Sequence, residues 1–230
     1  MRILLIPIFI VSLLSSDTYI HNSVITNSMI GNNIYSGSEK SSLISKNIIL
    51  KEKFTKIQVN FPIQLSVKKS YKNDVILKID KNFKDNISFK VYNDTLHINA
   101  LGSINTRLKT EVVINTVSLN ELDLKSTVRA NIKGFNSNRF KLFTSGTSRV
   151  NFSEGSIKNL FLDAKGTSKI YLEKIPIGNA TITAKGTSKI TINVSDYLNV
   201  TLSGVSKVKY LGNPKITKRL KSLGKLIKIK

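Results

Sequence analysis

The sequence has 230 residues, a length that suits one domain or two small ones. Its 36 Lys and Arg residues against 14 Asp and Glu give a net charge of +22, but a hydrophobic fraction of 40% is too high for a fully disordered chain. The absence of cysteine excludes disulfides and thiolate chemistry, and the two histidines, His21 and His97, are too few and too far apart for a zinc site or a His-based triad.

The N-terminus has the features of a secretory signal, which we assign to residues 1–16. Arg2 supplies a positive charge, and the largely apolar run Ile3–Leu14 is shorter than the roughly 20 residues that a membrane span needs. The two serines that follow do not form a clean cleavage motif, so an uncleaved N-terminal anchor is the alternative. No cysteine follows the run, which excludes a lipoprotein anchor. The sequence therefore predicts an exported protein, periplasmic, surface-located or secreted, with no membrane span apart from this signal segment.

The next segment, residues 17–46, is rich in Ser and Asn and shows neither a helical period nor a sustained strand period. We interpret it as a low-complexity linker, with a short strand over Thr18–Ile25 as the alternative. The main domain is then predicted to cover residues 47–230.

The first part of the main domain has apolar residues at every second position. The longest such run is uninterrupted: Ile57, Val59, Phe61, Ile63, Leu65 and Val67. This alternation predicts strands with one buried face. Pro62 lacks a backbone donor, so we expect its strand to be at a sheet edge or bulged there. The same spacing continues over 75–79, 87–91 and 96–98, and Asn93-Asp94 between two of these runs indicates a turn.

The second half of the main domain contains an internal repeat. The string Gly146-Thr147-Ser148-Arg149-Val150 recurs, with small changes, at Gly166–Ile170, Gly186–Ile190 and Gly204–Val208, so the glycines lie 20, 20 and 18 residues apart. A degenerate copy, Ser126–Ala130, precedes them, and we expect a last copy around Gly224. One such unit is too short for a helix pair or a propeller blade, but it fits one coil of a solenoid. The predicted fold class is all-β: a parallel β-solenoid, or β-helix, with coils of about 20 residues, preceded by an N-terminal region of alternating strands.

The alternation of side chains sorts the repeat into an inner and an outer face. In two successive copies the residues expected to line the core are Leu160, Leu162, Ala164, Ile170 and Leu172, then Ala180, Ile182, Ala184, Ile190 and Ile192. The repeated serine also points inward in this pattern, provided that the turn at the glycine does not change the alternation of side-chain directions. We interpret Gly146, Gly166, Gly186 and Gly204 as structural corners that permit a tight bend or a positive φ. A row of catalytic serines is disfavoured because no base lies near the serines in sequence.

The outward parity of the repeat carries a cation at the same position in every clear copy. These residues are Arg149, Lys169, Lys189 and Lys207, and two copies add Lys165 and Lys185. Coils stacked in register would place such charges about 5 Å apart. Two interpretations remain open: the cations keep exposed strands from aggregating, or they form an anion-binding ladder. No catalytic, cofactor-binding or metal-binding residues are predicted, and no cofactor.

The order of these features resembles the family described as an autotransporter adhesin, head GIN domain. The matching elements are Phe54-Thr55-Lys56-Ile57, Phe61–Leu65, Asp80-Lys81-Asn82-Phe83 and Asn93–Ile98, then the coil Val200–Val208 and the closing Gly212-Asn213-Pro214. The first coil has Ser126 where the family has Gly, and the middle coils have Ala-Lys-Gly in place of Leu-Ser-Gly. The resemblance covers about residues 47–230 and implies a β-solenoid, but it implies adhesion only weakly and brings no established binding residues.

The basic tail 215–230 has the charge of a membrane-binding amphipathic helix, but the resemblance and the repeat favour a final, capping coil.

The favoured functional hypothesis is a non-enzymatic, exported envelope protein, an adhesin or interaction module whose basic face meets an anionic glycan or envelope polymer. The first alternative is a structural protein that forms a homo-oligomer through the outward-facing Phe143 and Phe161. The second is a polysaccharide-active enzyme, which would need clustered acids, whereas Glu154, Asp163, Glu173 and Asp196 fall at different places in the repeat. Nucleic acid is a disfavoured partner because few aromatic residues accompany the basic positions and the protein is expected to be exported.

Overall fold

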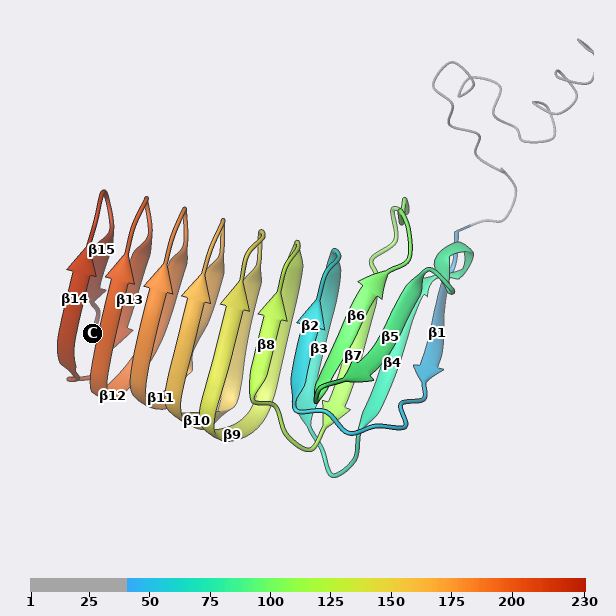
Figure 1. Cartoon of the computed structure of the whole chain (residues 1–230), viewed down its shortest axis with the longest axis horizontal. Coiled ribbons are helices and arrows are strands. Elements are labelled where there is room, and N and C mark those ends of the chain that lie inside the picture. Colours follow the sequence, from blue (N-terminus) through green and yellow to red (C-terminus); the bar gives the residue numbers. More distant parts are fainter. Residues whose placement is uncertain (1–40) are drawn as a thin grey trace, which may run out of the picture. The chain divides into compact units, whose positions relative to one another are not determined.

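The computed structural model describes residues 41–230, of which Ser42–Lys230 form one compact unit. The expected signal, residues 1–16, the alternative strand Thr18–Ile25 and most of the expected linker lie outside the described residues. The described residues form about five turns of a parallel β-solenoid after an N-terminal strand region (Figure 1), which confirms the predicted all-β fold class.

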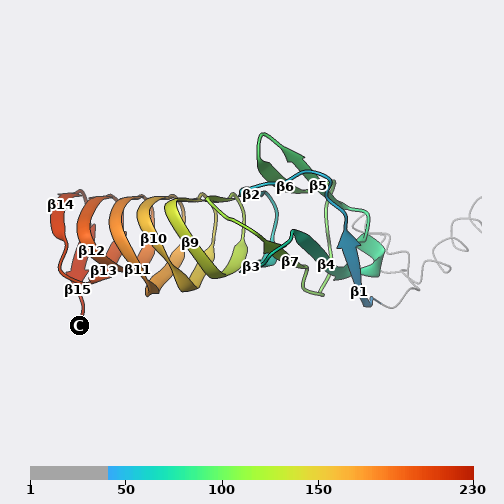
Figure 2. The same ribbon diagram turned by 90° about the horizontal axis from the view of Figure 1, so that it is seen from below.

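Each coil has two walls that are joined by a tight corner at one side and a wider bend at the other (Figures 1 and 2). We call the strand that leads into the corner the first wall and the strand that follows the corner the second wall. The long strands begin on the second wall, curve through the bend and end on the first wall of the next coil. They are β9 (Val128–Thr144), β10 (Arg149–Ala164), β11 (Lys169–Ala184) and β12 (Lys189–Leu202), and the last coil is formed by β13 (Lys207–Leu211), β14 (Lys215–Leu220) and β15 (Lys225–Lys228).

The N-terminal strands form the same two walls, but strands that are neighbours in a wall are not consecutive in the sequence. They are β1 (Leu43–Ile48), β2 (Lys56–Val59), β3 (Ile63–Lys69), β4 (Asp74–Asp80), β5 (Ile87–Tyr92), β6 (Thr95–Ala100), β7 (Glu111–Thr116) and β8 (Glu121–Leu124), with a 3-10 turn, η2, at Lys81–Phe83. On the first wall β2 pairs in parallel with both β6 and β8, and on the second wall β3 pairs in parallel with both β7 and β9. The coil β2–β3 is therefore stacked between two coils that come much later in the chain.

Antiparallel strands complete the N-terminal end of both walls. On the second wall β4 pairs with β7, and β1 pairs with β4. On the first wall β5 pairs with β6 through a two-residue connection. The predicted turn at Asn93-Asp94 is confirmed at this place: both residues have a positive φ, 49° and 61°, as a type I′ hairpin turn requires.

The long alternation from Ile57 to Val67 is two strands and not one. It is divided by a corner, residues 60–62, which aligns with the corner 125–127 of the next coil because Val59 pairs with Leu124 and Ile63 with Val128. The prediction that Pro62 marks an edge or a bulge is therefore wrong. Pro62 lies in the corner, between β2 and β3, where its missing N–H removes no bond from either ladder.

Strand β1 begins at Leu43, inside the segment that was expected to be linker up to residue 46. Because β1 is an outer strand with a mixed, largely polar sequence, its residues show little alternation, and the sequence does not predict a strand there. Its pairing with β4 covers the second wall at the N-terminal end.

The core is a set of apolar ladders, one residue per coil. All ten residues predicted to line it in the central copies are buried, with at most 3% of each side chain exposed. One ladder, for example, runs Ala130, Val150, Ile170, Ile190, Val208, each at most 1% exposed. Because each inward side chain packs on the equivalent one in the next coil, a 20-residue repeat is enough to specify the fold.

The basic tail forms strands, as the repeat predicted. Strand β14 pairs in parallel with β12, and β15 pairs in parallel with β13. Gly224, however, aligns with Ser206 and not with the corner glycine, whose place is taken by Ser222 with a φ of 56°. Lys218 stands opposite the buried Val200, so a charge occupies a core position of the last coil, which discourages further strand addition at that end.

Candidate binding face: the basic ladder

The cations predicted to form a ladder do lie in register on the second wall. Arg149 pairs with Lys169, Lys169 with Lys189, and Lys189 with Lys207. The ladder extends by one residue at each end, to Arg129 and Lys225. Parallel strands lie about 4.8 Å apart, so the six cations span roughly 24 Å along the stack.

The repeat did not lead us to predict two of the six cations, Arg129 and Lys225, although both follow recognisable copies of the motif. Arg129 stands in the degenerate copy Ser126–Ala130, which lacks the glycine, and Lys225 follows Gly224, which occupies the serine position. In both cases the cation is retained where the motif around it has changed. We call Arg129, Arg149, Lys169, Lys189, Lys207 and Lys225 the basic ladder.

The backbone holds the basic ladder at a fixed spacing. The amide N–H groups of Lys169, Lys189 and Lys207 each donate to the carbonyl of the serine one coil earlier, at 2.8 Å. Lys225 repeats the same bond to Ser206, at 2.9 Å. The cations are thus anchored directly after the corner, at the most regular part of every coil.

No member of the basic ladder forms an ion pair within residues 41–230. Five of the six side chains are exposed and Lys207 is half-buried. Acidic residues are absent from the ladder positions of these six coils, so the ladder is a column of uncompensated charge along the wall.

The two additional predicted cations behave differently from the ladder. Lys165 and Lys185 lie at the first position of the corner, where they align with Lys125. Lys165 forms an ion pair with Asp163 at 3.3 Å, and Lys125 forms one with Asp123 at 3.4 Å. Lys185 follows Thr183 and has no ion pair in the described part of the chain. Lys185 is therefore the one of the two that adds free charge beside the ladder.

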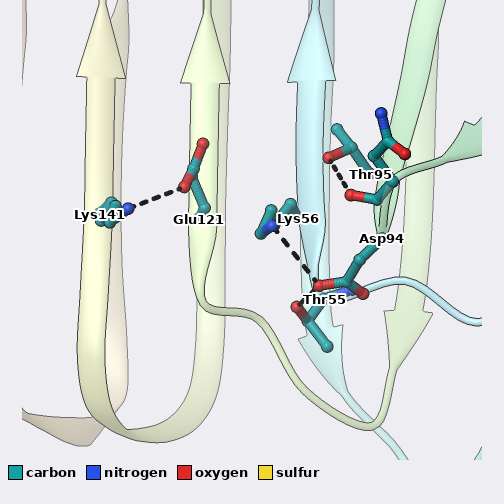
Figure 3. A network of polar contacts seen from close by, with 7 residues as sticks. Thr55, Lys56, Asp94, Thr95, Glu121 and Lys141 are labelled. Carbon is teal, nitrogen blue, oxygen red and sulfur yellow. Dashed lines mark hydrogen bonds and ion pairs between the residues drawn. The ribbon is translucent and has the colours of Figure 1, made fainter.

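At its N-terminal end the first wall pairs its cations with acids, in contrast to the basic ladder. At its N-terminal end Lys141 approaches Glu121 at 3.7 Å, and Lys56 approaches Asp94 at 3.8 Å (Figure 3). Asp94 also accepts two hydrogen bonds from Thr55, one from the backbone N–H and one from the hydroxyl. Opposite charges therefore alternate at this end of the first wall, whereas the exposed cations of β14, Lys215, Lys218 and Arg219, form no ion pair in residues 41–230.

The first wall also holds His97, which is buried. Its Nδ1 lies 3.0 Å from the Gln58 side-chain oxygen, and the Gln58 amide donates to Asp123 at 2.9 Å. Burial lowers the pKa of His97, and the charge of Lys125 lowers it further, against an opposite effect of Asp123. Burial and the charge of Lys125 thus favour the neutral form of the imidazole.

The four corner glycines occupy equivalent places next to the basic ladder. Gly166, Gly186 and Gly204 have φ between 69° and 82°, and a Cβ on any of them would lie 2.7 Å or less from the carbonyl oxygen of the preceding corner. Gly146 has no positive φ, but a Cβ there would lie 2.5 Å from the Ser126 carbonyl oxygen. At these four corners the coils stack too closely for a side chain, although Ser126 and Ser222 occupy the equivalent position in the coils on either side.

The repeated serines point into the core and bond to the polypeptide around them. Ser148, Ser168, Ser188 and Ser206 are at most 3% exposed. Ser148 donates to the Ser126 carbonyl at 3.2 Å, and Ser206 donates to the Gly186 carbonyl at 3.3 Å, both one coil earlier. The acids needed for a polysaccharide-active enzyme are dispersed, since Asp163 lies on the first wall and Glu173 on the second.

Groups of three or more His, Cys, Asp or Glu that could hold a metal ion are not found among residues 41–230. The same residues include no helix that is long and apolar enough to cross a membrane.

Solved structures with a similar fold include two from Bacteroides and Parabacteroides species. A protein from Bacteroides fragilis, described as "a putative adhesin", is 19% identical, with a TM-score of 0.70, over 83% of this chain and 98% of that chain. A "putative lipid binding protein" from Parabacteroides distasonis is 15% identical, with a TM-score of 0.50, over 82% and 97%. At these identities the likeness shows the fold alone. No curated protein sequence matches the chain.

The family model described as "Putative auto-transporter adhesin, head GIN domain" matches residues 53–214, from the residue before Phe54 to the closing Pro214. This match covers the coil β2–β3, the antiparallel strands β4 and β5 and the regular coils, including the five members of the basic ladder that lie on β9 to β13. The chain belongs to the head GIN domain family of adhesin-like proteins.

Proposed function

We propose that this protein is an exported, non-enzymatic adhesin-like module, and that its basic ladder binds an anionic polymer such as an acidic glycan of the cell envelope. Membership of an adhesin-like family and the neighbours described as adhesins support the general role. The features of a secretory signal in residues 1–16 support export. The observation that carries the binding proposal is the column of six cations without ion pairs.

The position of the ladder favours binding over protection from aggregation. Lysines deter strand addition when they stand on edge strands. The ladder cations from Arg129 to Lys207 stand on strands that are already hydrogen-bonded on both sides, and Lys225 alone is on the outer strand β15. Like charges about 5 Å apart repel each other by up to about 1 kcal/mol per pair before screening by salt. A polyanion would relieve that repulsion.

A linear polymer suits this geometry better than a single small anion. Each cation alone is an exposed charge in water and holds an anion weakly. A chain with charges at intervals near 5 Å would meet several cations at once, and each contact after the first needs no further loss of translational freedom. Binding would release counterions and would therefore weaken steeply with salt.

Retention on a column of immobilised dextran sulfate, eluted with a salt gradient, tests this proposal. The triple variant R149E/K169E/K189E should elute at much lower salt than the unchanged protein. The matched variant K51E/K158E/K174E changes the net charge by the same amount at exposed sites outside the ladder and should elute close to the unchanged protein. Equal losses in the two variants would mean that diffuse charge alone causes retention, and the proposal would be wrong.

Self-assembly through the two outward phenylalanines is the second candidate. The rings of Phe143 and Phe161, on adjacent coils of the first wall, lie 5.8 Å apart, and Phe161 is 40% exposed. The two rings partly cover each other, which leaves a small apolar patch for a partner. Sedimentation equilibrium at high protein concentration, compared with F161S, tests this candidate, and a monomer in both cases would remove it.

A further inference from the structure

A pocket near the N-terminal end of the solenoid is separate from the basic ladder except at one residue, Arg129. It has a volume of about 630 Å³ and lies on the corner side of three adjacent coils, β6–β7, β2–β3 and β8–β9. Its lining comes from the corner residues Phe61 and Pro62, from Ile63 and Gln64 at the start of β3, from Ala100 and the segment between β6 and β7, and from Thr127 and Arg129 of the next coil. Three coils at about 4.8 Å each give this groove an extent of roughly 10 Å along the stack.

One wall of the groove is an enlarged corner. In the regular coils four residues join the first wall to the second, whereas ten residues, 101–110, join β6 to β7. This segment contributes Ile104 and Leu108 to the lining. A solenoid coil needs no such enlargement for stacking, because the neighbouring coil β2–β3 closes with the residues 60–62 alone.

The enlarged corner is fixed in place by hydrogen bonds at both ends and in the middle. The Leu101 N–H donates to the Asn86 carbonyl at 2.8 Å, and the Thr110 carbonyl accepts from the Gln64 N–H at 2.9 Å. Between them the Thr106 hydroxyl donates to the buried carboxylate of Asp80 at 2.6 Å. The groove is therefore preformed, which reduces the entropy lost when a ligand enters.

The lining is apolar on its floor and basic at its rim. Phe61, Ile63, Ile104 and Leu108 supply the apolar surface, together with Pro62 and Ala100. The charged side chains of the lining are Lys109 and Arg129, both exposed and without an ion pair in residues 41–230. Apolar pockets of this volume with a few polar groups are the usual form of small-molecule sites.

We propose that this groove binds an anionic amphiphile, with its alkyl chain along the apolar floor and its phosphate or carboxylate on Arg129. The apolar side chains from three adjacent coils favour an alkyl chain as the buried part of the ligand. The two unpaired cations at the rim favour an anionic head group over a neutral one. The site goes beyond the proposed polymer binding and shares only Arg129 with it, so a lipid-linked anionic polymer could occupy both places.

Binding of decyl phosphate below its micelle-forming concentration, measured by isothermal titration calorimetry on the full chain, tests the proposal. Ethyl phosphate has the head group without the chain, and decyl maltoside has the chain without the charge. Decyl phosphate should bind at least tenfold more tightly than either. Shortening a buried chain should weaken binding by up to about fourfold for each methylene removed. Equal affinity for decyl and ethyl phosphate would overturn the proposal.

Two pairs of variants locate the site. R129Q should weaken decyl phosphate binding about tenfold, whereas R149Q, one coil further along the ladder and outside the lining, should leave it unchanged. L108Q should weaken it by a similar factor, whereas V205Q, an apolar corner residue 56% exposed far along the stack, should have no effect. Unchanged binding in both R129Q and L108Q would overturn the site.

A second experiment, with vesicles of phosphatidylglycerol and of phosphatidylcholine, distinguishes a membrane lipid from a free amphiphile as the ligand. Binding to phosphatidylglycerol vesicles that R129Q reduces more than R149Q would identify a membrane lipid, and binding of the monomer alone would identify a free amphiphile. Equal loss in R129Q and R149Q on vesicles, with no monomer binding, would overturn the proposal. L108Q should leave retention on dextran sulfate unchanged, so failure of the groove and failure of the ladder give different results.

Discussion

The regular coils from β9 to β12 and the N-terminal strands β1 to β8 build the same two walls by different routes. In the regular coils each residue stacks on the one about 20 positions earlier, so similar residues form continuous ladders. In the N-terminal region Gln58 stands between His97 and Asp123, which are 39 and 65 positions away, and unlike residues meet. Sequence repetition therefore produces a patterned surface, whereas interleaving produces individual polar networks and an irregular corner.

The first prediction concerns the backbone, which is closely stacked in the regular coils and open in the enlarged corner. Gly155 has a φ of 113°, and a Cβ on it would lie 2.0 Å from the Phe135 carbonyl oxygen one coil earlier. Gly102, in the enlarged corner, has an ordinary φ, and a Cβ there would meet nothing closer than 4.0 Å. We expect G155A to lower the free energy of unfolding by about 3 kcal/mol or more, from backbone strain together with displacement of the neighbouring coil.

Urea denaturation followed by circular dichroism measures this effect. G102A is the matched control, and it should change stability by less than about 1 kcal/mol or raise it slightly. A similar small effect in G155A would mean that the regular coils are not held at the close spacing described above.

The second prediction concerns the inward hydroxyls of the regular coils. The Thr144 and Ser168 hydroxyl oxygens lie 2.9 Å apart in the core, although the residues belong to successive coils. S168A leaves the Thr144 hydroxyl without this partner and should cost about 1–2 kcal/mol. The double variant T144V/S168A removes both polar groups and should regain part of that loss.

A double-mutant cycle in urea separates the pair from its surroundings. S188A is a useful comparison because the Ser188 hydroxyl has only a long bond, 3.4 Å, to the Lys185 carbonyl, and its loss should cost less. Additive effects of T144V and S168A would show that the two hydroxyls do not interact.

These two regions also differ in how much of them the sequence predicts. The 20-residue repeat predicts the coil, the inward residues and the cation column, because identical chemistry at a constant interval can only stack in register. It does not predict that β2–β3 lies between β6–β7 and β8–β9, since alternation shows which face of a strand is buried but not which strand is its neighbour. The one alternating run from Ile57 to Val67 could not reveal the corner at Pro62, because the inward parity continues through it.

The same limit applies to the candidate sites. Arg149, Lys169, Lys189 and Lys207 were predicted from the repeat, and Arg129 and Lys225 were missed because the residues around them depart from it. The ion pair that neutralises Lys165 could have been suspected from Asp163 two positions earlier, on the same face of the strand. The groove could not be predicted, because it depends on an irregular segment, residues 101–110, that lies beside a corner 40 residues earlier in the chain.

The third prediction compares the basic ladder with the ion pairs at the N-terminal end of the first wall. Replacing Lys169 by Gln removes two repulsive neighbours, Arg149 and Lys189, and should raise stability by a few tenths of a kcal/mol at low salt. The gain should fade as salt increases, because exposed charges are screened. K141Q on the first wall removes the contact with Glu121 and should lower stability or leave it unchanged. Thermal unfolding at two salt concentrations measures both, and a loss of stability in K169Q at low salt would contradict the repulsive ladder.

The smallest expected effect lies in the interleaved network around His97. Burial and the nearby Lys125 lower the pKa of His97 in the folded protein, so the unfolded chain binds its proton at a higher pH than the folded one. The stability that this histidine supports is therefore present above the unfolded pKa, near 6.5, and is lost as the pH falls below it.

H97Q keeps a neutral polar side chain and should make stability less dependent on pH between about 7 and 5. Urea midpoints at three pH values measure this slope. An identical slope in H97Q and the unchanged protein would mean that His97 is not held neutral by the strands that the fold brings together from distant parts of the chain.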